Sequence, residues 1–353
     1  MRNISDVDVN FKTKTDIGKD DVVFYDIEEE PFKIYGVTLE NGRYRRMPEA
    51  TAKSVSDAVD FLHSQTSGGR VRFKTDSPYI AIHAEMPYIG KMPHFALTGA
   101  AGFDVYVREN GVDQYKRALV PPFEITDGYD AVQDFRTTEM REITINFPLY
   151  SDVSKLYIGL SDKAQVLAPE PYRYQKPIVY YGHSITQGGC ASRPGNAYPN
   201  RISRRFDCDF INLGFSGSGR GEKEIAEYIA GLNMSIFVYD YDHNAPNIDH
   251  LRNTHERMFK IIRQTQPDLP IIMMTSTTMP HCSDDKEGRK EVIYNTYCNA
   301  VNNGDKNVYF IDGSKILAEC GFDATVDGAH PNDWGFYHIA NCVGDVIEEI
   351  LKT

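Results

Sequence analysis

The chain has 353 residues, of which 41% are hydrophobic and 25% charged, a composition typical of a folded globular protein. This length suits two domains better than one. The formal net charge of -12 argues against a general nucleic-acid binder, because phosphate binding needs a concentrated excess of Lys and Arg.

No segment predicts a membrane partner, since no apolar run approaches the roughly 18 residues of a membrane-spanning helix. The first residues, Met1 to Asp8, contain no apolar core of signal-peptide length. We therefore expect a cytoplasmic protein as the sequence is written, or a secreted or periplasmic one if a leader has been removed. The sequence leaves the oligomeric state open.

The cysteines lie in the second half of the chain and contain no Cys-x-x-Cys pair. This pattern favours buried or loop thiols over a zinc site or a disulfide framework, and we expect neither a metal nor a cofactor. The cysteines are Cys190, Cys208, Cys282, Cys298, Cys320 and Cys342.

The first half of the chain predicts an antiparallel β-sandwich of the jelly-roll type. Residues 1–30 are polar and acidic, which indicates an extended arm across the surface. From Phe32 to Leu167, short alternating runs are separated by turn residues, and Asn110-Gly111 predicts a hairpin. A helix is expected at 54–64. The expected strands include 32–37, 71–75, 79–84, 103–107, 143–147 and 155–160.

Closely spaced prolines at 168–172 predict a linker, after which strands and helices alternate as in a parallel sheet covered on both faces. We expect domains at 1–170 and 171–353. The expected strands are 177–181, 209–213, 235–240, 270–275 and 307–311. The expected helices are 196–206, 221–231, 249–266, 288–303 and 333–352.

A serine follows the first of these parallel strands, where the chain turns at Gly182. Ser184 then lies where the next helix begins, and free N–H groups at a helix start stabilise an oxyanion. The alternative is that Ser184 is only the N-cap of that helix, since serine is among the favoured capping residues.

Asp327 precedes His330 by three residues, and Pro331 follows directly. One short loop can thus supply a base and the carboxylate that orients it. Ser184, Asp327 and His330, in this chain order, predict a Ser-His-Asp triad. The alternative for Asp327 is a helix cap.

Two other motifs are rejected. Asp240-x-Asp242-x-Asn244 resembles the start of a calcium loop, but Ala245 and Leu251 occupy the positions that require Gly and Glu. The glycines of 214–219 depart from the dinucleotide-binding spacing and follow the second strand of the parallel part rather than the first.

Four blocks, at 182–188, 212–219, 240–246 and 327–331, resemble those of the SGNH (GDSL-type) hydrolases and occur in the same order. In addition, Gly102-Phe103-Asp104-Val105-Tyr106 resembles the GxDLY signature of a β-domain that precedes one SGNH subgroup. The resemblance implies a flavodoxin-like three-layer α/β/α catalytic domain behind the β-sandwich.

The resemblance also implies an oxyanion hole made by the backbone N–H groups of Ser184 and Gly217 and the side chain of Asn244. Gly217 is chosen over Gly214 because it follows Ser216 directly at the turn into the next helix, whereas Gly214 fits a tight turn. His183 replaces the Asp that the family usually has before the serine.

The resemblance to the subgroup with a preceding β-domain implies a serine esterase that removes small acyl groups, above all acetyl, from carbohydrate. The expected partner is a small-molecule or oligosaccharide ester. Alternatives are a carbohydrate-binding or adhesion protein on an SGNH scaffold with vestigial activity, or a lipase or thioesterase. Possible substrate-binding residues are His183, His243, Tyr241 and Trp334, although packing is the preferred interpretation for the two histidines.

Overall fold

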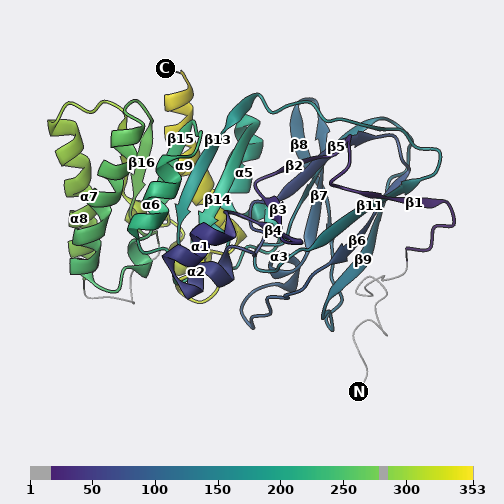
Figure 1. The fold of residues 1–353 in the computed structure, drawn as a ribbon, viewed down its shortest axis with the longest axis horizontal. Helices are drawn as coiled ribbons and strands as arrows, with labels where there is room; N and C mark the ends of the chain where they lie inside the picture. Colours follow the sequence, from purple (N-terminus) through teal and green to yellow (C-terminus); the bar gives the residue numbers. More distant parts are fainter. Residues whose placement is uncertain (1–16, 278–284, 353) are drawn as a thin grey trace.

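The computed structural model describes residues 17–277 and 285–352, with an antiparallel part and a parallel part lying side by side (Figure 1). The antiparallel part has two main sheets. One has the order β1 (Val22–Asp26), β11 (Lys155–Ser161), β6 (Tyr79–Glu85) and β9 (Gly128–Asp134). The other has the order β12 (Val166–Leu167), β5 (Arg70–Thr75), β10 (Arg141–Asn146), β7 (Phe103–Glu109) and β8 (Val112–Leu119), with β2 (Lys33–Tyr35) also paired to β5.

The two antiparallel sheets share one hydrophobic core, as the alternating sequence pattern requires. Phe73 of β5, Ile82 of β6 and Ile145 of β10 are all fully buried in it. Burying a side chain of this size contributes roughly 2 kcal/mol. The predicted β-sandwich is confirmed, and so is the hairpin, in which Asn110 and Gly111 have φ of 52° and 79° between β7 and β8.

The predicted surface arm is wrong at its C-terminal end. Residues 22–26 form β1, which pairs with β11 at the edge of a sheet. The strand itself is apolar, Val22-Val23-Phe24-Tyr25, but it is short, and the acidic residues on either side of it, Asp20-Asp21 and Glu28-Glu29-Glu30, favoured the prediction of an arm. Residues 1–16 of the arm lie outside the described residues.

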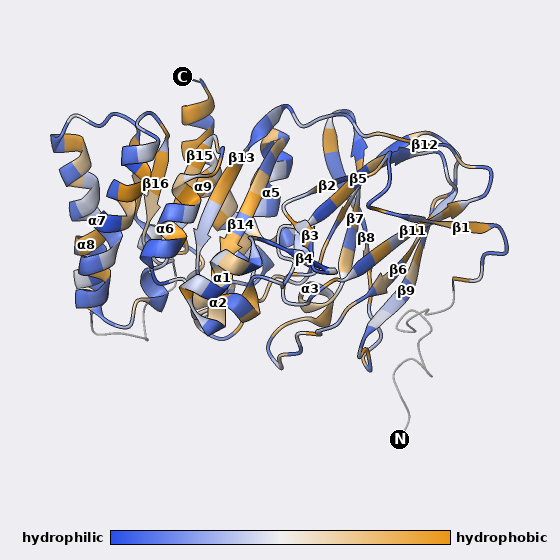
Figure 2. Ribbon diagram, in the orientation of Figure 1, coloured by the Kyte–Doolittle hydropathy of each residue, from blue (hydrophilic) through white to orange (hydrophobic). Residues whose placement is uncertain are grey.

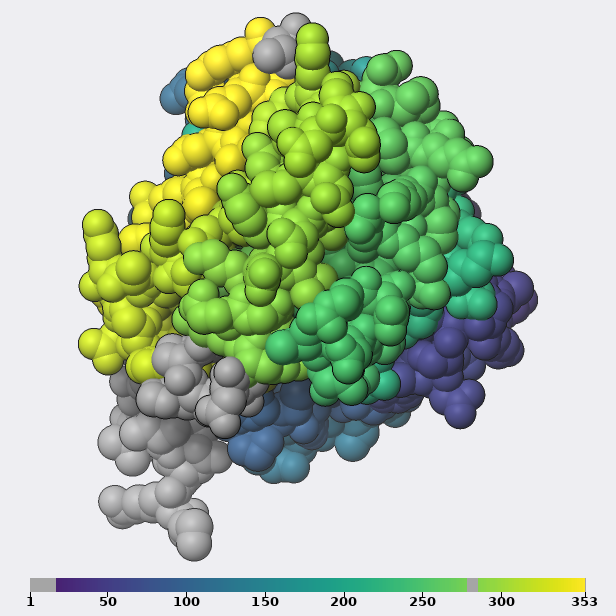
Figure 3. Space-filling view, turned by 90° about the vertical axis from the view of Figure 1, so that its left-hand side faces the viewer, coloured from purple at the N-terminus to yellow at the C-terminus, as the bar shows by residue number. Residues whose placement is uncertain are grey.

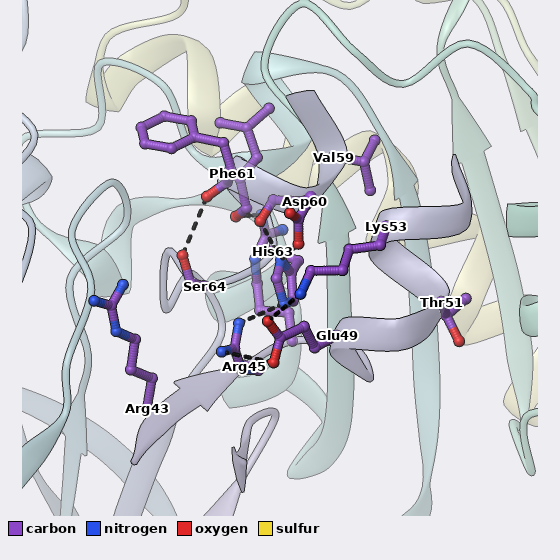
Figure 4. A network of polar contacts seen from close by, with 12 residues as sticks. Arg43, Arg45, Glu49, Thr51, Lys53, Val59, Asp60, Phe61, His63 and Ser64 are labelled. Carbon is purple, nitrogen blue, oxygen red and sulfur yellow. Dashed lines mark hydrogen bonds and ion pairs between the residues drawn. The ribbon is translucent and has the colours of Figure 1, made fainter. Parts of the chain in front are cut away.

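The helix predicted at 54–64 is two helices, α1 (Glu49–Val55) and α2 (Asp57–Leu62). The chain extends at Ser56, with φ of -172°, and the Ser56 hydroxyl accepts from the N–H of Val59 at 3.2 Å to cap α2. In Figure 4, Glu49 points to both Arg45 and Lys53, with which it pairs at 3.2 and 2.7 Å.

These two helices lie in the chain between β2 and β5 of the sandwich but pack on the parallel part. Ala52, Val59 and Leu62 share a core with Ile225 and Ile229 of α6 (Lys223–Ala230). Figure 3 shows the purple N-terminal segment lying against the green chain of the parallel part. The remaining small elements of the first half are β3 (Thr38–Glu40), β4 (Arg43–Arg45) and α3 (Leu97–Ala100).

The second half forms the predicted parallel sheet, with the strand order β14-β13-β15-β16-β17. This order is that of flavodoxin-like folds, in which ligands bind beyond the carboxyl ends of the strands. The predicted bounds differ from the observed ones by at most three residues. The strands are β13 (Tyr174–Gly182), β14 (Cys208–Gly214), β15 (Ile236–Asp240), β16 (Ile271–Met274) and β17 (Val308–Ile311).

Helices cover both faces of this sheet, and its strands are mostly apolar (Figure 2). In β13, Ile178 and Tyr180 face one core, while Val179 and Tyr181 face the other. The first core also takes residues from α5 (Tyr198–Phe206) and α9 (Asp333–Lys352). The second takes residues from α6, α7 (Ile248–Thr265) and α8 (Lys286–Asn302).

The change from antiparallel to parallel strands falls between β12 and β13, and the domain limits 1–170 and 171–353 stay a prediction. No helix within residues 17–277 and 285–352 is long and apolar enough to cross a membrane. The described cysteines, which exclude Cys282, are free thiols.

Two adjacent tyrosines of β13 give a matched test of the core. The Tyr180 hydroxyl is buried without a hydrogen-bond partner, whereas the Tyr181 hydroxyl accepts from Gly221 N–H at 2.8 Å and contacts Glu222 at 3.2 Å. We expect Tyr180→Phe to raise the free energy of unfolding by about 1 kcal/mol and Tyr181→Phe to lower it by about 1 kcal/mol. Urea unfolding measures both, and equal losses in the two variants would contradict the prediction.

Candidate active site

The candidate site is built on a four-residue helix, α4 (Ser184–Gln187), which begins where β13 ends. Gly182 makes this turn possible, because a Cβ there would lie 2.3 Å from the carbonyl oxygen of Asp240. The N-cap is His183, whose Nδ1 accepts from the N–H of Ile185 at 3.1 Å. The alternative that Ser184 is only a cap is therefore wrong, and its hydroxyl is left for another partner.

His183 is 1% exposed, and its Nε2 lies 3.1 Å from Oδ1 of Asp240, at the end of β15. Burial lowers the pKa of the imidazole, but the Asp240 carboxylate raises it more, so that the net shift is upward. Because Nδ1 accepts a hydrogen bond, a single proton on Nε2 satisfies both contacts. His183 thus positions α4 and is buried, in agreement with the preferred interpretation of packing and not with the possible binding role.

Ser184, His330 and Asp327 form a continuous hydrogen-bonded chain. Ser184 Oγ lies 2.9 Å from His330 Nε2, and His330 Nδ1 lies 2.8 Å from Asp327 Oδ2. Ser184 comes from α4, and the other two residues come from the loop before α9. Ser184 and His330 are 146 positions apart in the chain. The arrangement is that of a nucleophile, a base and a carboxylate that fixes the tautomer of the base.

Local backbone contacts fix the carboxylate of Asp327. Its Oδ1 accepts from the N–H groups of Ala329 at 3.0 Å and His330 at 2.7 Å. Partial burial raises the pKa of Asp327, but these bonds and the His330 ring outweigh it and bring the pKa to about 2. Asp327 therefore remains charged throughout the neutral range and can stabilise an imidazolium.

The three predicted oxyanion donors differ in how far the structure defines them. Gly217 has φ of +68°, a left-handed conformation that favours glycine, and open space where a side chain would lie. Asn244 accepts from Gly219 N–H at 3.2 Å through Oδ1, which leaves its amide N–H groups to donate. Among the described residues, neither Ser184 N–H nor Gly217 N–H donates to a protein acceptor.

The other predicted substrate-binding residues separate into buried and exposed. Tyr241 is 1% exposed and donates to Thr254 at 2.9 Å, so it belongs to the core and the prediction is wrong. His243 contacts the Ser276 hydroxyl and lies 4.8 Å from His183, ring to ring. Burial, with the charges of His183 and His330, holds the pKa of His243 far below its usual value. Trp334 is 50% exposed at the start of α9.

Sequence reasoning missed the residues that the sandwich brings to this site. Tyr150 donates to the Ser184 carbonyl at 3.1 Å, and His94 Nε2 lies 3.9 Å from Asp327 Oδ2. Gln65 accepts from Gln187 of α4 at 2.6 Å. These contacts span 34 to more than 200 residues of chain, so no local spacing in the sequence signals them.

A buried thiol also lies beside the candidate triad. Cys190 is 6% exposed, and burial, with the Asp327 charge, raises the pKa of its thiol to about 12. The thiol is therefore protonated at neutral pH, and it does not compete with Ser184 as a nucleophile.

A second group, His183, Asp240 and Asp242, has the composition of a cation site. The three residues are buried, and their ligand atoms lie within 4.8 Å of one another. Both ring nitrogens of His183 already have partners, to Ile185 and Asp240. Burial and the Asp240 charge raise the pKa of Asp242 to about 6.

Comparison with known structures decides the family. A protein of Bacteroides ovatus ATCC 8483 named as a GDSL-like lipase is 30% identical, with a TM-score of 0.84, and the match covers 94% of this chain and 98% of that one. The chain belongs to the GDSL-like, or SGNH, hydrolase family. A family model described as GDSL-like lipase/acylhydrolase matches residues 175–348, and a model described as the N-terminus of SGNH-hydrolase-type esterases matches 22–166.

Two more distant structures share the fold of this SGNH chain. A salicylyl-acyltransferase from a tetracycline biosynthetic pathway is 19% identical with a TM-score of 0.78, covering 94% of this chain and 98% of that one. An acetyl xylan esterase from the rumen bacterium Butyrivibrio proteoclasticus is 13% identical with a TM-score of 0.56, covering 94% and 99%. A comparison with curated proteins found no match.

One buried and one exposed histidine–aspartate pair give a matched test of the cap. His183→Ala removes the cap and leaves Asp240 buried without its partner, so we expect the free energy of unfolding to fall by about 3 kcal/mol. The control is His83→Ala, because His83 and Asp130 pair at 2.6 Å with side chains 46% and 37% exposed. That pair contributes less than about 1 kcal/mol. Chemical denaturation distinguishes the two, and equal losses would contradict a positioning role of His183.

Proposed function

We propose that this SGNH hydrolase is a serine esterase in which Ser184, His330 and Asp327 act as the catalytic triad. The observation that carries the proposal is the unbroken chain from Ser184 Oγ to His330 at 2.9 Å and from His330 to Asp327 at 2.8 Å. These distances are short enough for direct proton transfer in the resting enzyme.

In the first half of the reaction, Ser184 Oγ attacks the ester carbonyl while His330 Nε2 takes the serine proton. Asp327 accepts a hydrogen bond from Nδ1–H and stabilises the imidazolium. When the tetrahedral intermediate collapses, His330 donates the proton to the leaving alcohol oxygen. Water then attacks the acyl-serine with His330 again acting as the base, which releases the acid and restores Ser184.

The negative charge that develops on the carbonyl oxygen needs donors that are already in place. We assign them to the backbone N–H groups of Ser184 and Gly217 and the side-chain amide of Asn244. The absence of competing protein acceptors for the two backbone groups, within the described residues, supports this assignment. The hydrogen bond from Gly219 to the Asn244 oxygen supports it as well, because it orients the amide nitrogen.

We further propose that the acyl group is small, with acetyl on carbohydrate as the first candidate. The similar fold of an acetyl xylan esterase supports this choice. Acyl transfer to an acceptor alcohol is the second candidate, because the salicylyl-acyltransferase superposes better, with a TM-score of 0.78. In both cases the acyl-serine forms in the same way, and only the second nucleophile differs.

Removal of the nucleophile tests the triad. We expect Ser184→Ala to lower kcat by about 10⁴-fold or more on an activated acetyl ester, with the melting temperature unchanged. The control is Ser54→Ala, an exposed serine of α1, which should retain wild-type turnover. A Ser184→Ala protein that keeps its turnover would refute the triad. If the wild type binds sugars but turns over no ester, the chain is a binding protein.

A substrate panel separates the remaining candidates. We expect acetylated xylo-oligosaccharides and p-nitrophenyl acetate to have higher kcat/KM than p-nitrophenyl esters of longer acyl chains. Each reaction is run with and without an added alcohol, and free acid and acylated alcohol are quantified by chromatography. Preference for long chains would indicate a lipase instead, and accumulation of acylated alcohol would indicate a transferase.

A further inference from the structure

Three metal-binding side chains meet beside the candidate triad from distant parts of the chain. His94 precedes α3 in the sandwich, Cys190 follows α4, and His330 lies in the loop before α9. One ligand atom from each residue lies within 4.8 Å of the other two. No pattern in the amino-acid sequence signals this group, since its members share no motif and no regular spacing.

The two histidines of the group reach solvent, Cys190 is buried, and the group has an acidic neighbour. The side chains of His94 and His330 are 42% and 28% exposed, and their rings lie 5.8 Å apart. Asp327 Oδ2 lies 3.9 Å from His94 Nε2 and 2.8 Å from His330 Nδ1. A cation bound here therefore gains a carboxylate within reach as a further ligand.

Two imidazoles and one thiolate are a donor set that Zn²⁺ prefers over the hard cations. In a tetrahedral zinc site the ligand atoms lie about 3.5 Å apart, so the group must contract by roughly 1 Å. His94 can provide that movement, because its side chain is exposed and its polar neighbour in the described structure is Asp327. The buried group of His183, Asp240 and Asp242 lacks this freedom.

We propose that His94, Cys190 and His330 form a reversible binding site for Zn²⁺ or a similar divalent cation, which withdraws His330 from Ser184 when it is occupied. On binding, the Cys190 thiol releases its proton and the thiolate sulfur coordinates the metal. The inhibition rests on the proposed triad, whereas the binding does not. The sandwich thereby contributes a residue that can switch the hydrolase off.

Cobalt reports on this site independently of catalysis. Co²⁺ is titrated into metal-free full-length protein, and absorbance is followed in the near-ultraviolet and visible ranges. We expect a sulfur-to-cobalt charge-transfer band that saturates at one equivalent and disappears when Zn²⁺ is added. We expect Cys190→Ser to lose the band, with Cys342→Ser as the control that keeps it. Absence of the band from wild-type protein would overturn the proposal.

His94 is tested in the same titration by His94→Gln. We expect cobalt affinity to fall by at least about tenfold, because loss of a direct ligand costs no less than loss of a residue that only hydrogen-bonds to one. The control is His83→Gln, an exposed histidine of the same sandwich, which should bind like wild type. Unchanged affinity in His94→Gln would overturn the three-residue site.

Activity completes the test. We expect Zn²⁺ to inhibit ester hydrolysis and EDTA to restore it. In His94→Gln, the half-inhibitory concentration of Zn²⁺ should rise by the same factor as the cobalt dissociation constant. Each variant is normalised to its own metal-free rate. A zinc-loaded enzyme with full activity would overturn the inhibitory role of the site. If the protein hydrolyses no ester at all, the triad fails, and the cobalt band alone decides whether the metal site exists.

Discussion

The hydrogen bond from Ile185 N–H to His183 Nδ1, supported by Asp240 behind the ring, determines how this chain presents its serine. The bond fixes the start of α4, and therefore the position of Ser184 at the first turn of that helix. An imidazole performs the capping without placing a negative charge beside Ser184. The carboxylate that orients the imidazole belongs to Asp240 and contacts the other ring nitrogen, Nε2.

The antiparallel part also stabilises the candidate site, through contacts to the end of β14. Buried Arg46, which follows β4, donates to the carbonyl oxygens of Asn212 at 3.1 Å and Gly214 at 2.5 Å, at the end of β14. Its guanidinium also lies 4.8 Å from the centre of the Phe215 ring. Because a buried cation is costly unless its donors are satisfied, these contacts tie the antiparallel part to the loop that carries Gly217.

This arrangement explains why the two parts of the chain work as one molecule. Helices α1 and α2 extend the core over the parallel sheet, and Tyr150 reaches the carbonyl of Ser184. His94 brings a second imidazole to the carboxylate that orients His330. The sandwich therefore contributes contacts both to the turn that carries Ser184 and to Asp327 in the loop before α9.

The two kinds of sheet, the strand and helix order of the second half, and the turn that carries Ser184 could all be predicted from the amino-acid sequence, because periodicity and turn residues act over a few neighbours. It also identified the Asp327 and His330 pair, whose contacts are local. Three further features became visible only in three dimensions: His183 caps α4, Tyr241 lies in the core, and His94 and Cys190 adjoin His330. These outcomes depend on burial and on side chains from separate elements meeting in space, which no spacing along the chain encodes.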